Sequence, residues 1–557
     1  MNNPETFDYI VVGGGSAGCL LAARLSEDTS ASVLLIEAGP RDLNPWLHVP
    51  SGFFKTINNP RYDWQYETEP EPTLNNRRIA WPRGRVLGGS SAINGLIYIR
   101  GHADDFNDWA QRGNSGWGWS DVLPAFRAVE SQARGASEFH GADGGLGVED
   151  PAVGLELVTR FVEAGRQAGL PVNDDFNGAD QEGVGRFQLT TKHGRRSSSA
   201  RSFLVAAARR QNLKILTGVQ AERLELEGSR VTGIYCRRRE KALHLRCRRE
   251  IVLTAGTIGS TQILQLSGIG DPARLRAAGI TPTHALFGVG RHLQDHLQSR
   301  LVLRLNRPIS LNDFTRGPSR KLLIGLEYLL RRKGVLSFGA SLAGGFARTR
   351  LSADRPDIQF HFQPLSLDSY DGGLHPFPGA TISACQLRPE SEGTIFVTSP
   401  DPAARPEIRA NYLATERDRL TMVEGFRWAR RIASAPALAE IVAEEYRPGA
   451  AVESDEEILD YIRTTGSSIY HPSGTCRMGP DPDRGDVVDA RLRVHGLTGL
   501  RVADCSIMPR LISGNTNAAA IMIGERAARF IQNDMAATLG GTAAITAPAT
   551  HKMGRFA

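Results

Sequence analysis

The stretch FDYIVVGGGSAG, residues 7–18, decides the fold class that this sequence predicts. An apolar run of strand type ends in three glycines with GxGxxG spacing, namely Gly13, Gly15 and Gly18. The periodic segment CLLAARLSE, residues 19–27, predicts a helix, and VLLIEAG, residues 33–39, predicts a second strand. This order of strand, glycine loop, helix and strand predicts a Rossmann-like α/β domain that binds a dinucleotide.

Each part of this unit has a physical task in dinucleotide binding. Gly13 permits a tight turn, Gly15 lets the backbone approach a pyrophosphate, and Gly18 lets the helix pack close to the strand. The helix N-terminus offers unpaired amides to the phosphates. Glu37 ends the second strand, where a carboxylate can accept hydrogen bonds from a ribose. The unit alone does not distinguish FAD from NAD.

A second glycine-rich loop is not explained by an NAD enzyme. It is WPRGRVLGGSSAINGLIYIRG, residues 81–101. Gly88 and Gly89 remove side-chain obstruction, so the backbone amides of such a loop can lie against a ligand. The alternative is a tight turn between two strands.

Length and cysteine content restrict the class of protein. A chain of 557 residues exceeds what one hydrophobic core usually supports, so two or more domains are expected. Six cysteines without a CxxC pair or zinc spacing indicate reduced thiols, a cytoplasmic location and no metal site. The N-terminus has no secretory pattern, and no apolar run is long enough to span a membrane.

The positive charge of the chain is densest in one run. Net charge is +6, and the run is RRREKALHLRCRR, residues 237–249. It has no interleaved aromatic platform, and we expect no nucleic-acid partner. Strand-like segments on both sides favour a solvated hairpin turn, with contact to an anionic membrane surface as the alternative. Peripheral membrane contact therefore stays open.

Three polar side chains in the second half of the chain are candidates for chemistry. His471 precedes Pro472, and Asn515 opens the turn Asn-Thr-Asn before an Ala-rich helix. An imidazole suits proton transfer near neutral pH, but a structural histidine and a plain helix cap explain the pair at least as well on these residues alone. His361 lies among strand candidates typical of an antiparallel sheet over a cavity. It either lines a substrate cavity or makes a structural hydrogen bond.

The motifs along the chain resemble those of the glucose–methanol–choline (GMC) flavin oxidoreductases over roughly residues 5–531. In order, they are VVGGGSAG with Glu37, RGRVLGGSSAIN, GTIGSTQILQLSGIG, GVGRHLQDH, HPSGTCRMG, VVD, RVADCSIMP and NTNAA. The likeness extends to bacterial choline-dehydrogenase-like and medium-chain aliphatic alcohol dehydrogenases. The resemblance implies an α/β fold with an α+β substrate part: a Rossmann-like FAD-binding domain and a discontinuous substrate domain with an antiparallel sheet.

The resemblance also implies how the chain is divided. The FAD-binding domain would comprise residues 1–154, 193–300 and 465–533. The substrate domain would comprise residues 155–192 and 301–464. We expect residues 534–557 to form a flexible tail.

The implied cofactor is FAD without a covalent link. In some relatives a histidine of the second glycine loop tethers the flavin, and Ile93 stands at that position here. The residues that the resemblance and the first glycine loop assign to the cofactor are Gly13, Gly15, Ser16, Ala17, Gly18, Glu37, Ala38, Arg85, Leu87, Gly88, Ser91, Asn94, Gly95, Leu96, Ile97, Val219, Ala255, Asp504, Thr516 and Asn517.

The implied reaction is the oxidation of a primary alcohol to an aldehyde, with a hydride passing to the flavin. His471 would be the general base, and Asn515 would hydrogen-bond the substrate oxygen. Electrons would then pass to a quinone or another carrier. The helix that begins near Ala518 would present its positive end to the reduced flavin.

Three other functions stay open at this point: an oxidase that uses oxygen, a non-redox flavoprotein lyase with an idle flavin, and an NAD-dependent dehydrogenase. Two positions depart from the family pattern. Thr261 replaces the usual Pro or Ser, with little expected consequence. Leu342 stands where many relatives have Glu, which counts against a cationic substrate such as choline. The sequence does not predict which alcohol is used or the oligomeric state.

Overall fold

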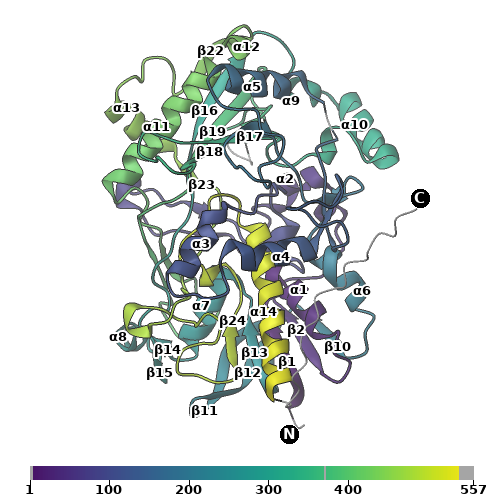
Figure 1. Ribbon diagram of the computed structural model, residues 1–557, viewed down its shortest axis with the longest axis vertical. Coiled ribbons are helices and arrows are strands. Elements are labelled where there is room, and N and C mark those ends of the chain that lie inside the picture. Colours follow the sequence, from purple (N-terminus) through teal and green to yellow (C-terminus); the bar gives the residue numbers. More distant parts are fainter. Residues whose placement is uncertain (1–3, 153, 369–371, 539–557) are drawn as a thin grey trace, which may run out of the picture.

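The structure is a computed structural model that describes residues 4–152, 154–368 and 372–538 (Figure 1). It contains two seven-stranded sheets, each with a hydrophobic cluster of its own. The first sheet lies in the lower half of Figure 1 and the second in the upper half. The expected α/β architecture, with a Rossmann-like part and an antiparallel part, is confirmed.

The first sheet has the strand order β10-β2-β1-β13-β12-β11, and β24 also pairs with β13. Five strands, β10, β2, β1, β13 and β24, pair in parallel, whereas β11 and β12 continue the sheet in antiparallel pairing. The strands are β1 (Glu5–Val12), β2 (Val33–Glu37), β10 (Leu213–Thr217), β11 (Gln220–Glu227), β12 (Arg230–Arg238), β13 (Lys241–Leu253) and β24 (Leu500–Val502).

The parallel strands bring distant segments to one edge of this sheet. Gly13 follows β1, Glu37 ends β2, Val219 lies just beyond β10, Ala255 just beyond β13, and Asp504 just beyond β24. Ligands of open α/β sheets bind outside the carboxyl ends of the strands. The five residues therefore mark the edge at which a dinucleotide belongs.

Glycine at position 18 is required where β1 turns into α1 (Ser16–Leu25). A Cβ at Gly18 would lie 2.0 Å from the carbonyl oxygen of Gly13 and 2.5 Å from Oγ1 of Thr254. The helix packs this close to the strand because Gly18 has no side chain. On its other side, α1 packs against α14 (Asn517–Thr538).

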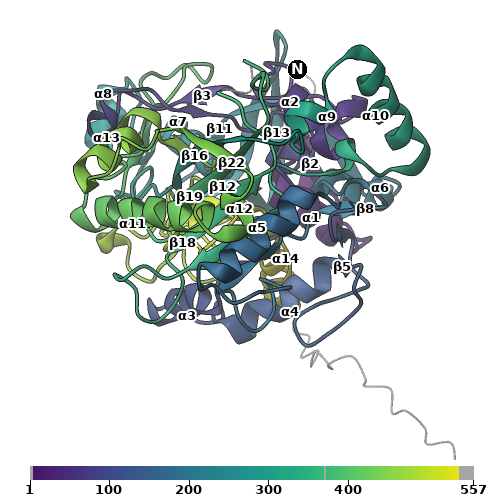
Figure 2. The same ribbon diagram turned by 90° about the horizontal axis from the view of Figure 1, so that it is seen from above.

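The second sheet is antiparallel, with the strand order β22-β16-β19-β18-β17-β7 and β23 beside β16. Helices α5 (Glu156–Gln167) and α11 (Glu416–Ala433) pack on this sheet, and Figure 2 shows them side by side along it. The strands are β7 (Gly183–Arg186), β16 (Leu297–Leu305), β17 (Ala343–Ala347), β18 (Ile358–Gln363), β19 (Gly379–Gln386), β22 (Val442–Arg447) and β23 (Ser467–Ser468).

The C-terminal helix corrects one boundary. Helix α14 runs through Thr538, five residues into the segment expected to be a flexible tail from residue 534. The carboxylate of Asp534 pairs with Arg491 and with the buried Arg501, which ties this last turn to the first domain. Residues 539–557 of the expected tail lie outside the described residues.

The basic run at residues 237–249 forms a hairpin, as expected. It covers the end of β12, a turn at Arg239 and Glu240, and most of β13. Several of its cations are paired: Arg237 with Glu222, and Arg246 with Glu225 and Glu227. This neutralisation weakens the alternative of an anionic membrane contact at the run.

The close approach at Gly18 predicts opposite effects for two Gly→Ala substitutions. Gly18→Ala should destabilise the fold by about 1–3 kcal/mol, because backbone must move to admit a methyl group. Gly325 lies inside the helix α10 (Pro318–Arg331), and a Cβ there would have no neighbour within 4 Å. Gly325→Ala should therefore stabilise the fold by up to about 1 kcal/mol. Thermal denaturation of both variants tests this, and equal midpoints for Gly18→Ala and the unmutated protein would contradict it.

Candidate active site

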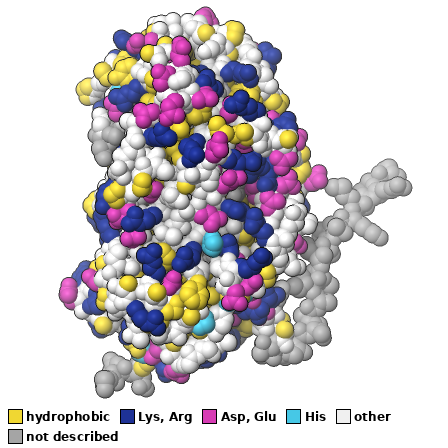
Figure 3. All heavy atoms as spheres, turned by 90° about the vertical axis from the view of Figure 1, so that its left-hand side faces the viewer, with side chains coloured by type: hydrophobic (Ala, Val, Ile, Leu, Met, Phe, Trp, Pro, Cys, Tyr) yellow, Lys and Arg dark blue, Asp and Glu magenta, His cyan; other side chains and the backbone are white. Residues whose placement is uncertain are grey.

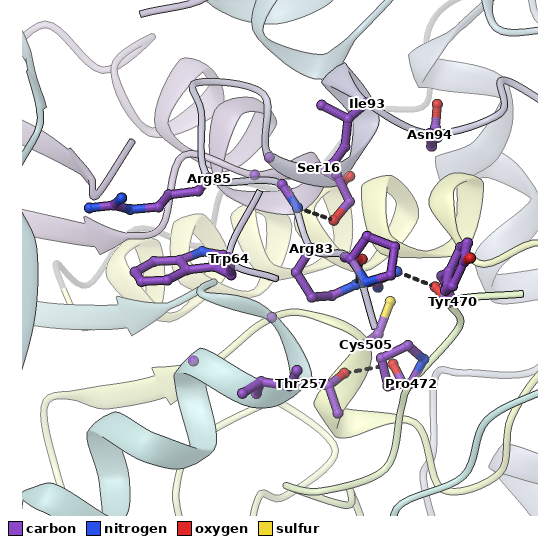
Figure 4. Close-up of a pocket in the computed structure, with 18 of the residues that line it drawn as sticks. Ser16, Trp64, Arg83, Arg85, Ile93, Asn94, Thr257, Tyr470, Pro472 and Cys505 are labelled. Atoms are coloured by element: carbon purple, nitrogen blue, oxygen red, sulfur yellow. Dashed lines mark hydrogen bonds between the residues drawn. The ribbon is translucent and has the colours of Figure 1, made fainter. Parts of the chain in front are cut away.

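A cavity of about 530 Å³ is lined by residues from both sheets (Figure 4). On one side it reaches the carboxyl ends of the parallel strands, and on the other it reaches β16 and β18 of the antiparallel sheet. Most of the residues predicted from the sequence line it: Gly13, Gly15, Ser16, Ala17, Glu37, Ala38, Arg85, Asn94, Gly95, Leu96, Ile97, Val219, Ala255, His361, His471, Asp504, Asn515, Thr516 and Asn517.

Four predicted cofactor residues do not line the cavity but support the loops behind it. Gly18 lets α1 approach β1, and Leu87 packs against the first glycine loop at Gly14. Gly88, at φ 98°, donates its N–H to the Gly14 carbonyl at 2.7 Å. The Ser91 hydroxyl donates to the Gly88 carbonyl at 2.5 Å. The two glycine loops are therefore bonded to each other.

The edge of the parallel sheet has the donor set that a dinucleotide needs. Helix α1 begins at Ser16 with no side-chain cap and no acidic residue in its first turn, so its free amides can meet phosphate. A Cβ at Gly15 would have no neighbour closer than 3.9 Å, which leaves room for a ligand. Buried Nε of Arg85 makes no hydrogen bond within the protein. These features fit a bound dinucleotide.

Glu37 is placed to accept from a ribose. Its two carboxylate oxygens accept from the Gly14 N–H at 2.9 Å and the Gly39 N–H at 2.7 Å. Burial raises the pKa of this carboxyl to about 7, although the two amide bonds oppose the rise. Each oxygen keeps a second lone pair, so hydroxyl groups of a ligand can still donate to it.

A buried carboxylate fixes the loop that carries His471. The N–H of His471 donates to Oδ1 of Asp295 at 2.7 Å. The other oxygen of Asp295 accepts from the hydroxyls of Tyr412 and Ser468. Because β23 pairs with β16 beside this network, the antiparallel sheet helps to hold the histidine in place.

A chain of hydrogen bonds determines which nitrogen of His471 is protonated. Nε2 of His296 lies 2.9 Å from the Leu387 carbonyl, which can only accept, so this nitrogen carries a proton. Nδ1 of neutral His296 is then an acceptor, and it lies 3.0 Å from Nδ1 of His471. His471 must therefore donate from Nδ1, which leaves its Nε2 unprotonated, with a lone pair that can accept.

Asn515 meets that lone pair from the other side. Its side-chain amide nitrogen lies 3.3 Å from Nε2 of His471. Its amide oxygen accepts from the Gln359 side chain at 3.2 Å, which orients the group. At the adjacent helix ends, the Ser16 hydroxyl donates to Asn517 at 2.8 Å, so the N-termini of α1 and α14 lie together.

The histidines of the cavity are neutral. Burial lowers the pKa of His471 well below its ordinary value, and nearby His296, Arg83 and His361 lower it further. Burial likewise lowers the pKa of His296 to about 4 and that of His361 to about 4. A neutral imidazole with an unprotonated Nε2 can take a proton from a donor in the cavity.

The end of the cavity formed by the antiparallel sheet carries an arginine and no carboxylate. Arg300 and Gln298 on β16 and Gln363 on β18 line this end. Nε of Arg300 makes no hydrogen bond, and no carboxylate of the described residues lies within ion-pair distance of its guanidinium. The acidic residues of the cavity, Glu37 and Asp504, lie at the edge of the parallel sheet.

Leu342 does not have the position expected for it. It is 1% exposed and belongs to the core of the second sheet, whereas the preceding Ala340 and Ser341 line the cavity. A side chain at 342 therefore does not set the charge at this end of the cavity. Arg300 supplies the charge there, and Gln298 lies near it on the same strand.

Several residues of the site were not predicted from the sequence. Asp295 and His296 belong to the motif GVGRHLQDH, to which no role was assigned. Arg83, in the second glycine loop, donates to the Tyr470 carbonyl at 2.6 Å beside the histidine (Figure 4). For Asp295 and His296, the signal in the sequence was that two residues suited to proton chemistry adjoin each other in a family motif. No sequence signal pointed to Arg300, because its position in the cavity depends on strand pairing.

Two family models match the chain. The N-terminal GMC oxidoreductase model matches residues 7–298, and the C-terminal GMC oxidoreductase model matches residues 389–524. The chain belongs to the GMC oxidoreductase family. This GMC oxidoreductase is an FAD-dependent enzyme.

Known proteins with similar sequences and structures span almost the whole GMC chain. An alcohol dehydrogenase [acceptor] of Pseudomonas putida is 43% identical over 94% of this chain and 95% of its own. An oxygen-dependent choline dehydrogenase of Vibrio vulnificus is 41% identical over 95% and 94%. The crystal structure of pyridoxine 4-oxidase from Mesorbium loti has a TM-score of 0.86 at 34% identity, covering 95% of this chain and 99% of that one.

The hydrogen bonds that join Leu387, His296 and His471 yield a prediction about His296. The variant His296→Phe keeps the ring volume but removes the acceptor that fixes the tautomer of His471, so kcat/KM should fall about 10- to 100-fold. Because His296 also lowers the pKa of His471, the acid limb of the kcat/KM–pH profile should move to higher pH. The pH profile and the flavin content of the purified variant are the measurements.

A matched control is His375→Phe. His375 is also buried, but it bonds Ser366 and Asp368 away from the cavity. We expect its kcat/KM to stay within about twofold of the unmutated enzyme and its acid limb to stay in place. If His296→Phe keeps full activity and its acid limb does not move, then the hydrogen bond to His296 does not fix the tautomer of His471.

Proposed function

We propose that this enzyme oxidises a primary alcohol to an aldehyde and that His471 is the general base. The observation that carries the proposal is the unprotonated Nε2 of His471, which lines the cavity and accepts from the amide nitrogen of Asn515 at 3.3 Å. The names of the similar alcohol and choline dehydrogenases support an alcohol substrate.

FAD would be held by the residues that line the edge of the parallel sheet. We assign its ADP half to the first glycine loop, the N-terminus of α1, Glu37 and Val219, and its flavin half to residues 94–97 with Asp504 and the 515–517 turn. When bound, FAD supplies the acceptor for the hydride. Ile93 lines the cavity and offers no nucleophile, which supports a non-covalent cofactor.

The residues of the chain would supply the proton chemistry. Nε2 of His471 takes the hydroxyl proton while the hydride leaves the alcohol carbon, so the carbon–oxygen bond becomes a carbonyl. The Nδ1–H of His471 still points at the lone pair of His296, which holds the ring in one orientation while the proton is taken up. Asn515 donates toward the same space and orients the substrate oxygen.

A quinone or another carrier is the proposed electron acceptor, in line with the Pseudomonas putida alcohol dehydrogenase [acceptor]. Oxygen is the alternative acceptor, since pyridoxine 4-oxidase has a similar structure. A lyase with an idle flavin is the alternative without net redox chemistry. Mixing with an alcohol under anaerobic conditions separates the lyase from both oxidising classes, because only oxidation of the alcohol bleaches the flavin.

The proposed substrate carries no cationic head group. Arg300 on β16 and His361 on β18 both lie opposite Ser383 of β19, so their backbones are about 10 Å apart. A substrate that reaches from the base along this sheet meets an unpaired guanidinium. A quaternary ammonium group there would be repelled, whereas an uncharged or anionic end would be accepted.

The base assignment predicts that His471→Ala lowers kcat by about 10²–10⁴-fold. Asn515→Ala should lower kcat by a smaller factor, because it removes one orienting hydrogen bond and leaves the base in place. Steady-state turnover with an artificial acceptor and the rate of anaerobic flavin bleaching measure both effects, and the flavin spectrum reports that FAD is retained. If the flavin of His471→Ala is bleached at the same rate as that of the unmutated enzyme, His471 is not the general base.

The positive charge of Arg300 predicts how the preference between a cationic and an uncharged alcohol changes when this residue is replaced. The ratio of kcat/KM for choline to that for 1-butanol should be low in the unmutated enzyme, and Arg300→Gln should raise it by roughly tenfold. Arg300→Lys keeps the charge and should keep the ratio. Arg304→Gln removes a cation farther along β16, where it is exposed and pairs with Glu444 at 3.2 Å. An equal rise in the Arg304 variant would show that Arg300 has no specific part.

A further inference from the structure

Helix α10 (Pro318–Arg331) lies on the surface, and its apolar side faces solvent. Tyr328 is its buried side chain. Leu322, Leu323, Leu326, Leu329 and Leu330 are between 43% and 81% exposed. They are five of the eleven large hydrophobic side chains exposed in the described part of the chain, so nearly half of this surface is gathered on one helix.

The five leucines form one face. At about 100° per residue they fall within an arc of about 120°, and Tyr328 lies on the opposite side of the helix. The helix therefore contacts the rest of the protein through the side that carries Tyr328, and its leucine face points to solvent. Figures 1 and 2 show α10 at the periphery, beyond the helices that cover the antiparallel sheet.

Cations surround this face. Residues 316–333 contain six basic side chains, Arg316, Arg320, Lys321, Arg331, Arg332 and Lys333, against a single acid, Glu327. A second copy of this chain would bring like charges together, which opposes a dimer through α10. An anionic surface with an apolar interior matches both the charge and the leucines.

The opposite side of the molecule lacks such a feature. Figure 3 shows that face with Lys and Arg interspersed among Asp and Glu and with hydrophobic side chains in small, separate groups. Within the described ranges, no helix combines the length and the apolar character needed to cross a bilayer. Membrane contact would therefore be a docking of α10.

We propose that α10 is a membrane-docking helix that lies in the headgroup region of an anionic phospholipid bilayer, with its five leucines inserted. The chain that leaves α10 forms the short helix Val335–Ser337 and then lines the cavity at Ala340 and Ser341. Docking thus brings this wall of the cavity close to the bilayer. The proposal is independent of which alcohol is oxidised.

The test is flotation of the full-length holoenzyme with vesicles. With about one third phosphatidylglycerol in phosphatidylcholine, the unmutated enzyme should float, and it should float less with pure phosphatidylcholine or at high salt. Leu326→Glu with Leu329→Glu should lower the partition coefficient by about tenfold or more. Both side chains are exposed, so turnover with a soluble artificial acceptor should remain.

Phe287→Glu is the matched control. Phe287 is 56% exposed and follows β15 (His284–Ala285), at the lower left of Figure 1 and far from α10. This variant should float like the unmutated enzyme. The proposal is overturned if the unmutated enzyme does not float with anionic vesicles, or if the double variant floats equally well. It is also overturned if light scattering finds a dimer that the double variant dissociates while neither binds vesicles.

Discussion

The hydrogen bond between the Nδ1 atoms of His296 and His471 is the contact on which the site depends. His296 lies at the start of β16, and His471 follows β23, its partner strand. The Leu387 carbonyl, at the end of β19, determines the direction of both bonds, because it can only accept. A backbone carbonyl in the antiparallel sheet thereby decides that Nε2 of the histidine faces the cavity unprotonated.

The two sheets divide the work at the cavity. The parallel sheet contributes backbone amides, the two carboxyls of Glu37 and Asp504 at its edge and the N-termini of two helices, which suit the polar and negatively charged groups of a dinucleotide. The antiparallel sheet contributes the histidines, amides and arginine that would meet a substrate. Burial is the shared constraint, since it keeps the imidazoles neutral and makes each unpaired polar atom in the cavity costly unless a ligand satisfies it.

The outer surface of the second half carries a separate feature. Helix α10 is anchored mainly through Tyr328, whose hydroxyl donates to the Gly194 carbonyl at 3.0 Å, while its leucines are left in water. The exposed leucines leave apolar area that an apolar partner could still bury. Only residues 332–339, which include the short helix Val335–Ser337, separate α10 from Ala340 and Ser341, which line the cavity.

The sequence alone determined the parts of the protein that are local in the chain. The GxGxxG turn with Glu37 and the second glycine loop were predictable, because each relies on a few neighbouring residues with a distinctive backbone need. His471 and Asn515 were proposed only through the resemblance of their motifs to a family, since their own residues fit a structural histidine and a helix cap equally well. The tertiary structure decided the rest. Strand pairing placed His296 beside His471, 175 residues away, and put Arg300 in the cavity. It also moved Leu342 into the core and set Gly18, Leu87, Gly88 and Ser91 behind the cavity. These outcomes depend on which side of a strand or helix is covered, and only the packing of distant segments determines that.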